Sequence, residues 1–231
     1  MLELDDIDAG YGGARVLREV NVWLPPQSVV ALLGTNGAGK TTLLRVASGL
    51  LAPTSGRLTI DGEDLTGKRP HALARAGVCH VPEGRGVFPT LTVKENILIQ
   101  AAGGDPGEAV ERAVTAFPVL GEKLGQLAGS LSGGQQQMLA LARAYVTDAD
   151  YVLLDEVSMG LAPVVVDEIF EFLGRLAEDG RALLLVEQYV SRALELADYV
   201  YLMNRGRIEF AGEPGELDGD RLVAQYLGAH T

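Results

Sequence analysis

The chain has 231 residues, 47% of them hydrophobic, and it carries a formal net charge of −12 at pH 7 with a single cysteine, Cys79. This length suffices for one α/β domain with a full core, and the acidity argues against general attraction to nucleic acid or anionic lipid. One cysteine excludes an internal disulfide, and no apolar stretch approaches the roughly 20 residues that span a bilayer. Because acids crowd the first eight residues, we expect no signal peptide and a soluble, cytoplasmic protein.

The first 24 residues predict strands. Apolar residues alternate with acids over 2–7, as in an edge strand, and a second strand pair is expected over 16–24. The glycine turn at 10–13 carries Tyr11. An aromatic residue in such a turn is either a partly exposed packing residue or a flat face for an adenine ring, and spacing alone leaves both open.

A phosphate-binding loop is predicted directly after an apolar strand over 29–33. Its pattern is a glycine, four residues, then Gly-Lys-Thr, and residues at helical spacing follow it. The loop comprises Gly34, Thr35, Asn36, Gly37, Ala38, Gly39, Lys40, Thr41 and Thr42. Its glycines let backbone N–H groups converge on an anion, and the helix start adds the positive end of its dipole. Lys40 would reach the β- and γ-phosphates of a nucleoside triphosphate, and the Thr41 hydroxyl would bind Mg²⁺.

The middle of the chain predicts two more strands and then helices. Strands are expected over 57–62 and 77–82, and a polar loop follows at 83–86. From 92 to about 146 the pattern is helical, with breaks at 103–107 and at Gly121. We therefore expect a helical subdomain over 88–146, inserted into a core made of 1–87 and 147–231.

The last helix of this block begins with the sequence Leu-Ser-Gly-Gly-Gln at 131–135. Ser132 is a good N-cap, and Gly133 and Gly134 expose the first free N–H groups of the helix. An isolated Ser-Gly-Gly is usually only a cap, but beside a phosphate loop it indicates a second anion-binding helix end. No lysine or acid stands next to it, so it could only complete a site built elsewhere.

Two acids end the apolar strand predicted over 151–156. The carboxyl end of a parallel strand is where such a sheet binds its ligand. Asp155 would hold Mg²⁺ directly or through water, and Glu156 is placed to take a proton from an attacking water. The alternative is a pair of solvated acids that open a loop.

The rest of the chain predicts alternating helices and strands. A helix over 163–178 would bury Val166, Ile169, Phe170, Leu173 and Leu176, and a buried strand over 182–186 would end at Glu187 and Gln188. A helix over 191–197, a hairpin of 199–203 with 208–211, and a short helix over 220–227 complete the chain.

The phosphate loop, the 131–135 signature and the strand ending at Asp155 and Glu156 together resemble the ATP-binding-cassette (ABC) ATPases over essentially the whole chain. The resemblance implies an α/β P-loop NTPase fold: a RecA-like, mostly parallel sheet core with an N-terminal antiparallel β subdomain and an inserted helical subdomain. It implies one ABC ATPase domain over 1–231 that binds ATP and Mg²⁺. Tyr11 would stack on adenine with Val16 packing close by, and Glu156 would act as general base.

The same resemblance implies a head-to-tail dimer. Ser132, Gly133, Gly134 and Gln135 of one subunit would close over the ATP bound by the other, and the loop at 158–162 would communicate across the interface.

Three positions depart from the commonest family pattern. Glu83 stands where a glutamine usually touches Mg²⁺, Gln188 stands where a histidine usually contacts the γ-phosphate, and Val157 replaces a frequent proline. Gln188 can still donate a hydrogen bond to phosphate, but it cannot carry charge.

These departures, with the segments 81–89 and 185–188, are similar to the second ATPase subunit of branched-chain amino acid importers. Urea and short-amide importers are similar and stay open, as does a non-transport cassette ATPase; a P-loop kinase would leave 131–135 and Glu156 without a role. The importer resemblance implies a second ATPase subunit, transmembrane permease subunits and a substrate-binding protein. It also implies no nucleic acid, and membrane contact only through the permeases on the inner face.

Overall fold

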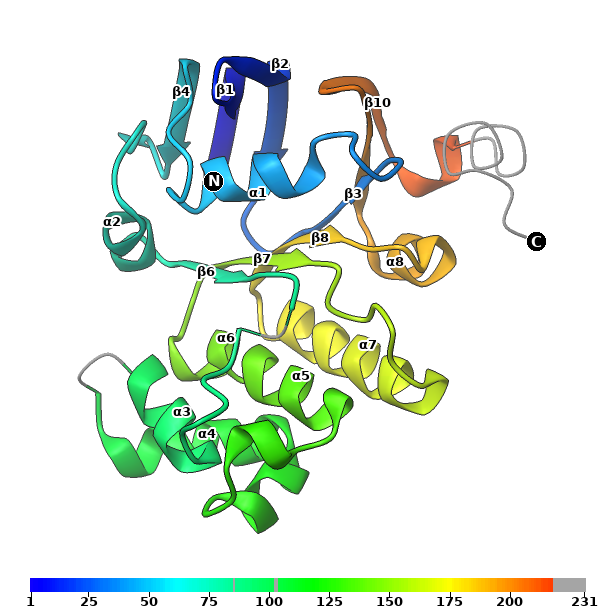
Figure 1. Cartoon of the computed structure of the whole chain (residues 1–231). Helices are drawn as coiled ribbons and strands as arrows, with labels where there is room; N and C mark the ends of the chain where they lie inside the picture. Colours follow the sequence, from blue (N-terminus) through cyan, green and yellow to red (C-terminus); the bar gives the residue numbers. More distant parts are fainter. Residues whose placement is uncertain (85, 102–103, 218–231) are drawn as a thin grey trace.

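The computed structural model describes residues 1–84, 86–101 and 104–217. The architecture is α/β: a six-stranded sheet lies in the middle, an antiparallel sheet lies on one side of it, and a group of helices lies on the other (Figure 1). None of the described helices is long and apolar enough to cross a membrane. The short helix predicted over 220–227 lies outside the described residues.

The central sheet has the strand order β10-β9-β3-β8-β7-β6. Its strands are β3 (Val29–Leu33), β6 (Val78–Val81), β7 (Tyr151–Asp155), β8 (Ala182–Val186), β9 (Tyr199–Asn204) and β10 (Arg207–Gly212). Neighbours from β6 to β9 pair in parallel, whereas β9 and β10 form the predicted antiparallel hairpin. Parallel pairing brings the carboxyl ends of β3, β6, β7 and β8 to one edge, where α/β sheets bind ligands.

The smaller sheet is antiparallel, with the order β2-β1-β4-β5. It comprises β1 (Leu2–Tyr11), β2 (Ala14–Leu24), β4 (Ser55–Ile60) and β5 (Glu63–Asp64). The prediction of an edge strand at 2–7 was wrong, because β1 pairs with β2 on one side and with β4 on the other. Alternation of apolar and acidic residues reports one buried face of a strand, and it says nothing about how many neighbours the strand has.

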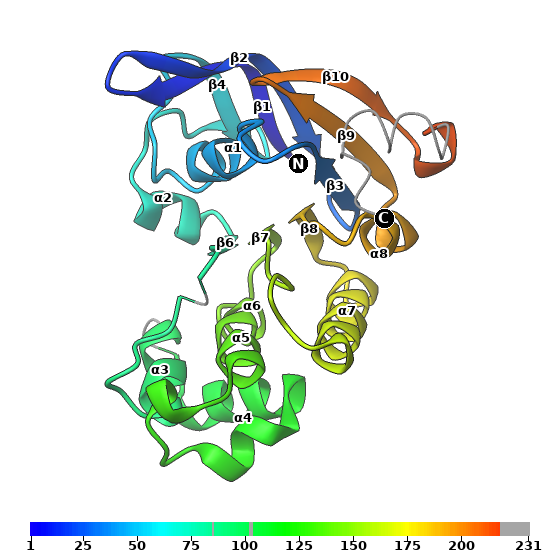
Figure 2. The same ribbon diagram turned by 45° about the vertical axis from the view of Figure 1, so that its right-hand side comes forward.

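Two hydrophobic cores lie on the two faces of the central sheet. Val30 and Leu32 of β3 face the core shared with the antiparallel sheet and with α1 (Lys40–Ala47). Ala31 and Leu33 face the core shared with the helices on the other side. Because both faces are covered, β3, β7 and β8 are buried at every residue, which explains their uninterrupted apolar sequences. Figure 2 shows α1 between the two sheets, so the phosphate loop before it is anchored in a packed core.

The helices predicted over 92–146 are present, with breaks near the expected positions. They are α3 (Val93–Gln100), α4 (Pro106–Ala116), α5 (Gly133–Leu141) and α6 (Arg143–Val146), with the 3₁₀ turns η1 (Pro118–Lys123) and η2 (Ala128–Ser130). They gather away from the antiparallel sheet in both views (Figures 1 and 2). The division of the chain at 88 and 146 stays a prediction. The other helical elements are α2 (Pro70–Arg75), α7 (Pro163–Glu178), α8 (Val190–Leu196) and η3 (Pro214–Glu216).

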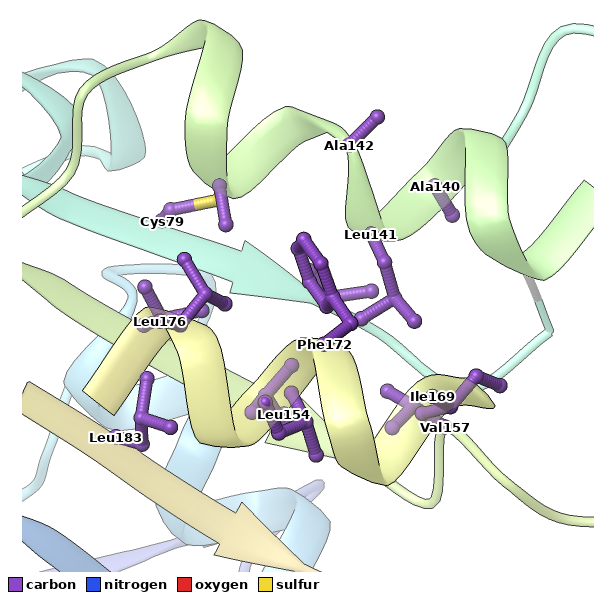
Figure 3. Packing of buried hydrophobic residues seen from close by; sticks show 14 of the residues in the cluster. Cys79, Ala140, Leu141, Ala142, Leu154, Val157, Ile169, Phe172, Leu176 and Leu183 are labelled. Atoms are coloured by element: carbon purple, nitrogen blue, oxygen red, sulfur yellow. The ribbon is translucent and has the colours of Figure 1, made fainter. Parts of the chain in front are cut away.

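Helix α7 joins the helical group to the sheet. Its buried stripe contains Phe172, whereas Phe170, which we expected there, is only partly buried. Phe172 lies three residues after Ile169 and four before Leu176, so it shares their face, and its ring lies 4.5 Å from that of Phe117. Figure 3 shows Phe172 between α7 and Leu141 of the signature helix α5. The prediction that Phe170 is buried was wrong because both residues are apolar phenylalanines, and they differ only in the direction in which they project from the helix.

Candidate nucleotide-binding site

A cavity of about 390 Å³ lies at the carboxyl edge of the central sheet. Its lining comes from β2, from the loop between β3 and α1 with the first turn of α1, and from the segments that follow β6, β7 and β8. The lining residues are Val16, Asn36, Gly37, Gly39, Lys40, Thr41, Thr42, Glu83, Glu156, Met159 and Gln188. The fold thus brings together residues that lie up to 172 positions apart in the sequence, from Val16 to Gln188.

Two glycines of the phosphate loop are required by the backbone. Gly34 has φ 154°, and a Cβ atom there would lie 2.2 Å from the carbonyl oxygen of Met203. Gly39 has φ 114° and caps α1 without a side-chain hydrogen bond, so the first N–H groups of the helix are left for a ligand. Ala38, by contrast, is buried, and its backbone bonds to Thr35 and Gly206, so its side chain serves packing.

Lys40 is a buried cation at the start of α1. Its Nζ atom donates to the carbonyl oxygens of Gly34, at 2.9 Å, and of Thr35, at 3.2 Å. The nearest carboxylate oxygen, Glu156 Oε1, lies 4.0 Å away. Burial lowers the pKa of Lys40, and the charges of Glu156 and Asp155 oppose that shift. The loop therefore holds an ammonium group at the start of α1, and an ammonium group is a donor suited to phosphate oxygens.

Asp155 is 1% exposed at the end of β7. Its Oδ1 atom accepts a hydrogen bond from the Thr41 hydroxyl at 3.2 Å, while its Oδ2 atom is buried and has no hydrogen-bond partner. Burial, together with the charges of Glu156 and Glu83, raises the pKa of Asp155 to about 6, although the Thr41 hydrogen bond and the Lys40 charge oppose that shift. A buried, unpartnered carboxylate oxygen beside a hydroxyl fits a hard cation such as Mg²⁺.

No group of three or more His, Cys, Asp or Glu side chains placed to hold a metal ion occurs within 1–84, 86–101 and 104–217. A cation at Asp155 and Thr41 would therefore need oxygens from phosphate and water to complete its coordination. That is the usual manner in which Mg²⁺ binds with a nucleotide.

Glu156 projects into the cavity from a sharp turn. Its φ of 48° takes the chain out of β7, and its backbone N–H still donates to the carbonyl oxygen of Val186 at 2.8 Å. Gln188 Nε2 donates to Glu156 Oε2 at 3.0 Å and lies 3.4 Å from Met159 Sδ. The candidate base is thus oriented by the very glutamine that the sequence placed at the γ-phosphate position.

The structure leaves some predicted site residues outside this cavity. Val16 lines it, but Tyr11 does not; Tyr11 is 43% exposed, and its hydroxyl accepts a hydrogen bond from Arg45 at 3.1 Å. The signature residues 132–135 do not line it either. Ser132 instead caps α5, and its hydroxyl accepts from the Gln135 N–H at 3.3 Å, while Gln135 Oε1 accepts from the Ser132 N–H at 3.2 Å.

Sequence reasoning missed the roles of two residues near the reacting groups. Met159 lines the cavity and contacts Gln188, although it was considered only as part of a loop. Glu187 is buried beneath Gln188, although we expected only a polar strand end there. A glutamate after an apolar strand carries no local signal that distinguishes a buried partner from a solvated side chain.

The comparison with known proteins decides the family. A family model described as "ABC transporter" matches residues 17–159, which is more than half of the chain. The chain belongs to the ABC transporter family. Its fold is correspondingly that of an ABC ATPase cassette, and the nucleotide that this family binds is ATP.

Curated relatives of this ABC protein match it along most of its length. The high-affinity branched-chain amino acid transport ATP-binding protein BraG of Pseudomonas aeruginosa is 40% identical, covering 90% of this chain and 91% of BraG. The protein named "Probable branched-chain amino acid transport ATP-binding protein LivF" of Archaeoglobus fulgidus is 39% identical, covering 94% of each chain. The lipopolysaccharide export system ATP-binding protein LptB of Escherichia coli is 30% identical, covering 98% and 97%.

Solved structures give the same family. The ADP conformation of MJ1267, an ATP-binding cassette of an ABC transporter, has a TM-score of 0.84 and 27% identity, covering 97% of each chain. A nucleotide-free ATP-binding cassette from an ABC transporter has a TM-score of 0.82 and 27% identity, covering 92% of this chain and 91% of that one.

Proposed function

We propose that this chain is the ATP-hydrolysing subunit of an ABC importer that takes up branched-chain amino acids. One observation carries the catalytic part: Lys40 and Glu156, from two distant segments, line one cavity at the phosphate loop, and the buried Asp155 is hydrogen-bonded to Thr41, which also lines it. The transport part is supported by the names of BraG and LivF, which are 40% and 39% identical to this chain, against 30% for LptB.

ATP would bind along the phosphate loop. The N–H groups of residues 34–39 and the first turn of α1 would receive the phosphates, and the Lys40 ammonium would exchange its carbonyl partners for β- and γ-phosphate oxygens. Val16 would pack against the base, with Tyr11 as the stacking residue. The Tyr11 hydroxyl accepts a hydrogen bond from Arg45. Adenine would therefore stack on the face of the Tyr11 ring while this hydrogen bond is kept.

Thr41 and Asp155 would hold Mg²⁺, with Glu83 close enough to contribute charge. A bound Mg²⁺ would neutralise part of the phosphate charge that develops during hydrolysis. Glu156 would accept the proton of the attacking water, and Gln188 would keep that carboxylate turned into the cavity. Gln188 would also donate to the γ-phosphate, but as a neutral amide it supplies no charge there.

The signature residues 132–135 would complete the site of a partner subunit. They lie outside the cavity of their own chain, although they form a helix end suited to an anion. A head-to-tail dimer would bring them onto the ATP of the other subunit, and the loop 158–162 would lie between the two sites. The partner would be a second ABC ATPase subunit or another copy of this chain.

Permease subunits would carry the substrate through the membrane, and a substrate-binding protein would deliver it to them. The described helices cannot span a bilayer, so this chain would reach the inner face of the membrane through the permeases. Substrate choice would then reside in the permeases and the binding protein, and this chain would supply the energy of ATP.

Uptake of labelled leucine and urea tests the transport proposal. Cells that lack this chain should lose leucine uptake, and expression of the wild-type chain should restore it, while a Lys40→Ala chain at equal abundance should not. Loss of urea uptake with leucine uptake intact would assign the chain to the alternative importer class.

A further inference from the structure

Glu187 is a buried acid that lies next to the reacting groups without facing their cavity. It follows the last residue of β8 and is 3% exposed. Within the described residues no cation pairs with it, and the charge that it meets is that of Glu156. A buried carboxyl group without a counter-charge is tolerated only where hydrogen bonds hold it. The partners of Glu187 therefore indicate its role.

Three hydrogen bonds converge on the Glu187 carboxyl group. It accepts from the backbone N–H of Ser158 at 3.1 Å, from the Ser158 hydroxyl, and from the backbone N–H of Gln188 at 3.3 Å. Ser158 is itself completely buried. A single carboxyl group thus joins the loop that follows β7 to the loop that follows β8.

The backbone explains why a side chain is needed for this connection. β7 and β8 pair in parallel up to Asp155 and Val186, and the N–H of Glu156 adds one more bond to Val186. At Glu156 the positive φ turns the chain out of the strand, so the ladder of backbone bonds cannot continue. The carboxyl group of Glu187 then accepts the N–H of Ser158 in place of a strand carbonyl.

The groups held by this contact are those that line the cavity. Glu156 precedes Ser158 by two residues, Met159 follows Ser158, and Gln188 follows Glu187. Above the buried contact, the Gln188 amide donates to Glu156 and contacts Met159. The Glu187–Ser158 contact therefore connects the loop that carries the base with the loop that carries the glutamine.

We propose that Glu187 is a positioning residue for hydrolysis: its bonds to Ser158 fix Glu156 relative to Gln188 and link both to the loop 158–162. The inference rests on the proposed function, since it assumes that Glu156 acts on water. It adds a residue that neither touches nucleotide nor lines the cavity, and it predicts that turnover is affected while ATP binding is not.

Steady-state hydrolysis and the binding of a fluorescent ATP analogue test this in Ser158→Ala, Glu187→Ala and the double variant. We expect kcat to fall about tenfold to a hundredfold in each, because small misplacements of reacting groups have effects of that size. KM and analogue affinity should stay within about twofold of wild type. The double variant should be no slower than the slower single variant, because the two single substitutions remove the same Glu187–Ser158 contact. Glu187→Gln keeps the size of the side chain and one acceptor oxygen, but its NH2 group would meet a backbone N–H that the carboxyl group now accepts, so kcat should lie between those of wild type and Glu187→Ala.

Controls separate this role from a merely structural one. Glu168→Ala, at an exposed site on α7, should leave kcat unchanged. Unchanged kcat in a folded Ser158→Ala protein would overturn the inference, and so would a parallel loss of analogue affinity. Ser158→Ala, which removes one hydroxyl, decides the question if Glu187→Ala does not fold. If the wild-type chain hydrolyses ATP and Ser158→Ala equals it, only this inference fails; if the wild-type chain is inactive with its partners, the proposed function fails as well.

Discussion

The chain contains two helix starts that suit an anion, and they differ in how their N–H groups are used. At α1 the N-cap is Gly39, which offers no side chain, so the first N–H groups face the cavity. At α5 the N-cap is Ser132, and a capping box with Gln135 binds two N–H groups internally. The first end is open: Lys40 and Glu156 line the cavity in front of it, and Asp155 is hydrogen-bonded to Thr41 of its first turn. The second end is capped, and its residues do not line that cavity. The first end therefore has charged groups of its own chain beside it, whereas the second would have to meet such groups on another chain.

The largest expected effect tests the chemistry at the open end. Glu156→Gln removes the candidate base while keeping its shape and its bond to Gln188, so kcat for ATP should fall by about 10² to 10⁴. ATP affinity should persist, and light scattering should show a dimer with Mg·ATP and a monomer without it. Glu168→Gln, on the exposed side of α7, is the control. Hydrolysis at a near-normal rate in Glu156→Gln would show that another group accepts the proton.

The next effect concerns binding at the same end. Lys40→Ala removes the buried ammonium beside Gly34 and Thr35, and charge-assisted hydrogen bonds of this kind are worth about 1.5–3 kcal/mol. The Kd for ATP, measured by titration of the purified chain, should therefore rise by about tenfold to a hundredfold. The exposed Lys68→Ala variant should bind as wild type does. Undiminished affinity in Lys40→Ala would mean that the open end is not the phosphate site.

A pH effect follows from Asp155. Its folded pKa, about 6, lies above the ordinary value of 3.8, so the folded state is penalised as the carboxyl group ionises. Without nucleotide or metal, the free energy of unfolding should fall by about 1 kcal/mol between pH 5 and pH 8 through this group. Urea unfolding of wild type and Asp155→Asn should show that loss in wild type alone. Mg·ATP should reverse it, because a cation stabilises the ionised form; an identical pH dependence in both proteins would contradict the assignment.

The open end could be predicted from sequence because its parts are local. A buried strand, a glycine loop with Lys40 and a helix occur within 20 residues, and steric requirements at Gly34 and Gly39 leave few other residues possible there. The position of β1 inside its sheet and the burial of Phe172 in place of Phe170 depend on which distant segments pack against them. The Glu187–Ser158 contact spans 29 residues and arises only where β7 and β8 lie side by side. Periodicity cannot show such contacts, since it describes one element at a time.

The smallest effect addresses the capped end. Ser132→Ala should lower the free energy of unfolding by about 1 kcal/mol through loss of the cap, and Thr92→Ala, which removes the matching capping box of α3, should do the same. ATP affinity of the single chain should stay unchanged in both. ATP hydrolysis should fall in Ser132→Ala alone, because of these two helix starts only that of α5 would contact nucleotide.

Mixing variants then shows on which chain the capped end acts. Ser132→Ala and Lys40→Ala chains are each expected to hydrolyse ATP slowly when they pair with themselves. In a mixed dimer, the intact phosphate loop of the Ser132→Ala chain meets the intact signature of the Lys40→Ala chain, so one working site forms and activity returns. No recovery, with mixed dimers proven by differently tagged chains, would place the signature in the site of its own chain. Recovery of activity would show that the α5 helix start of one chain completes the phosphate-loop site of the other chain. Neither helix start would then form a full site within a single chain.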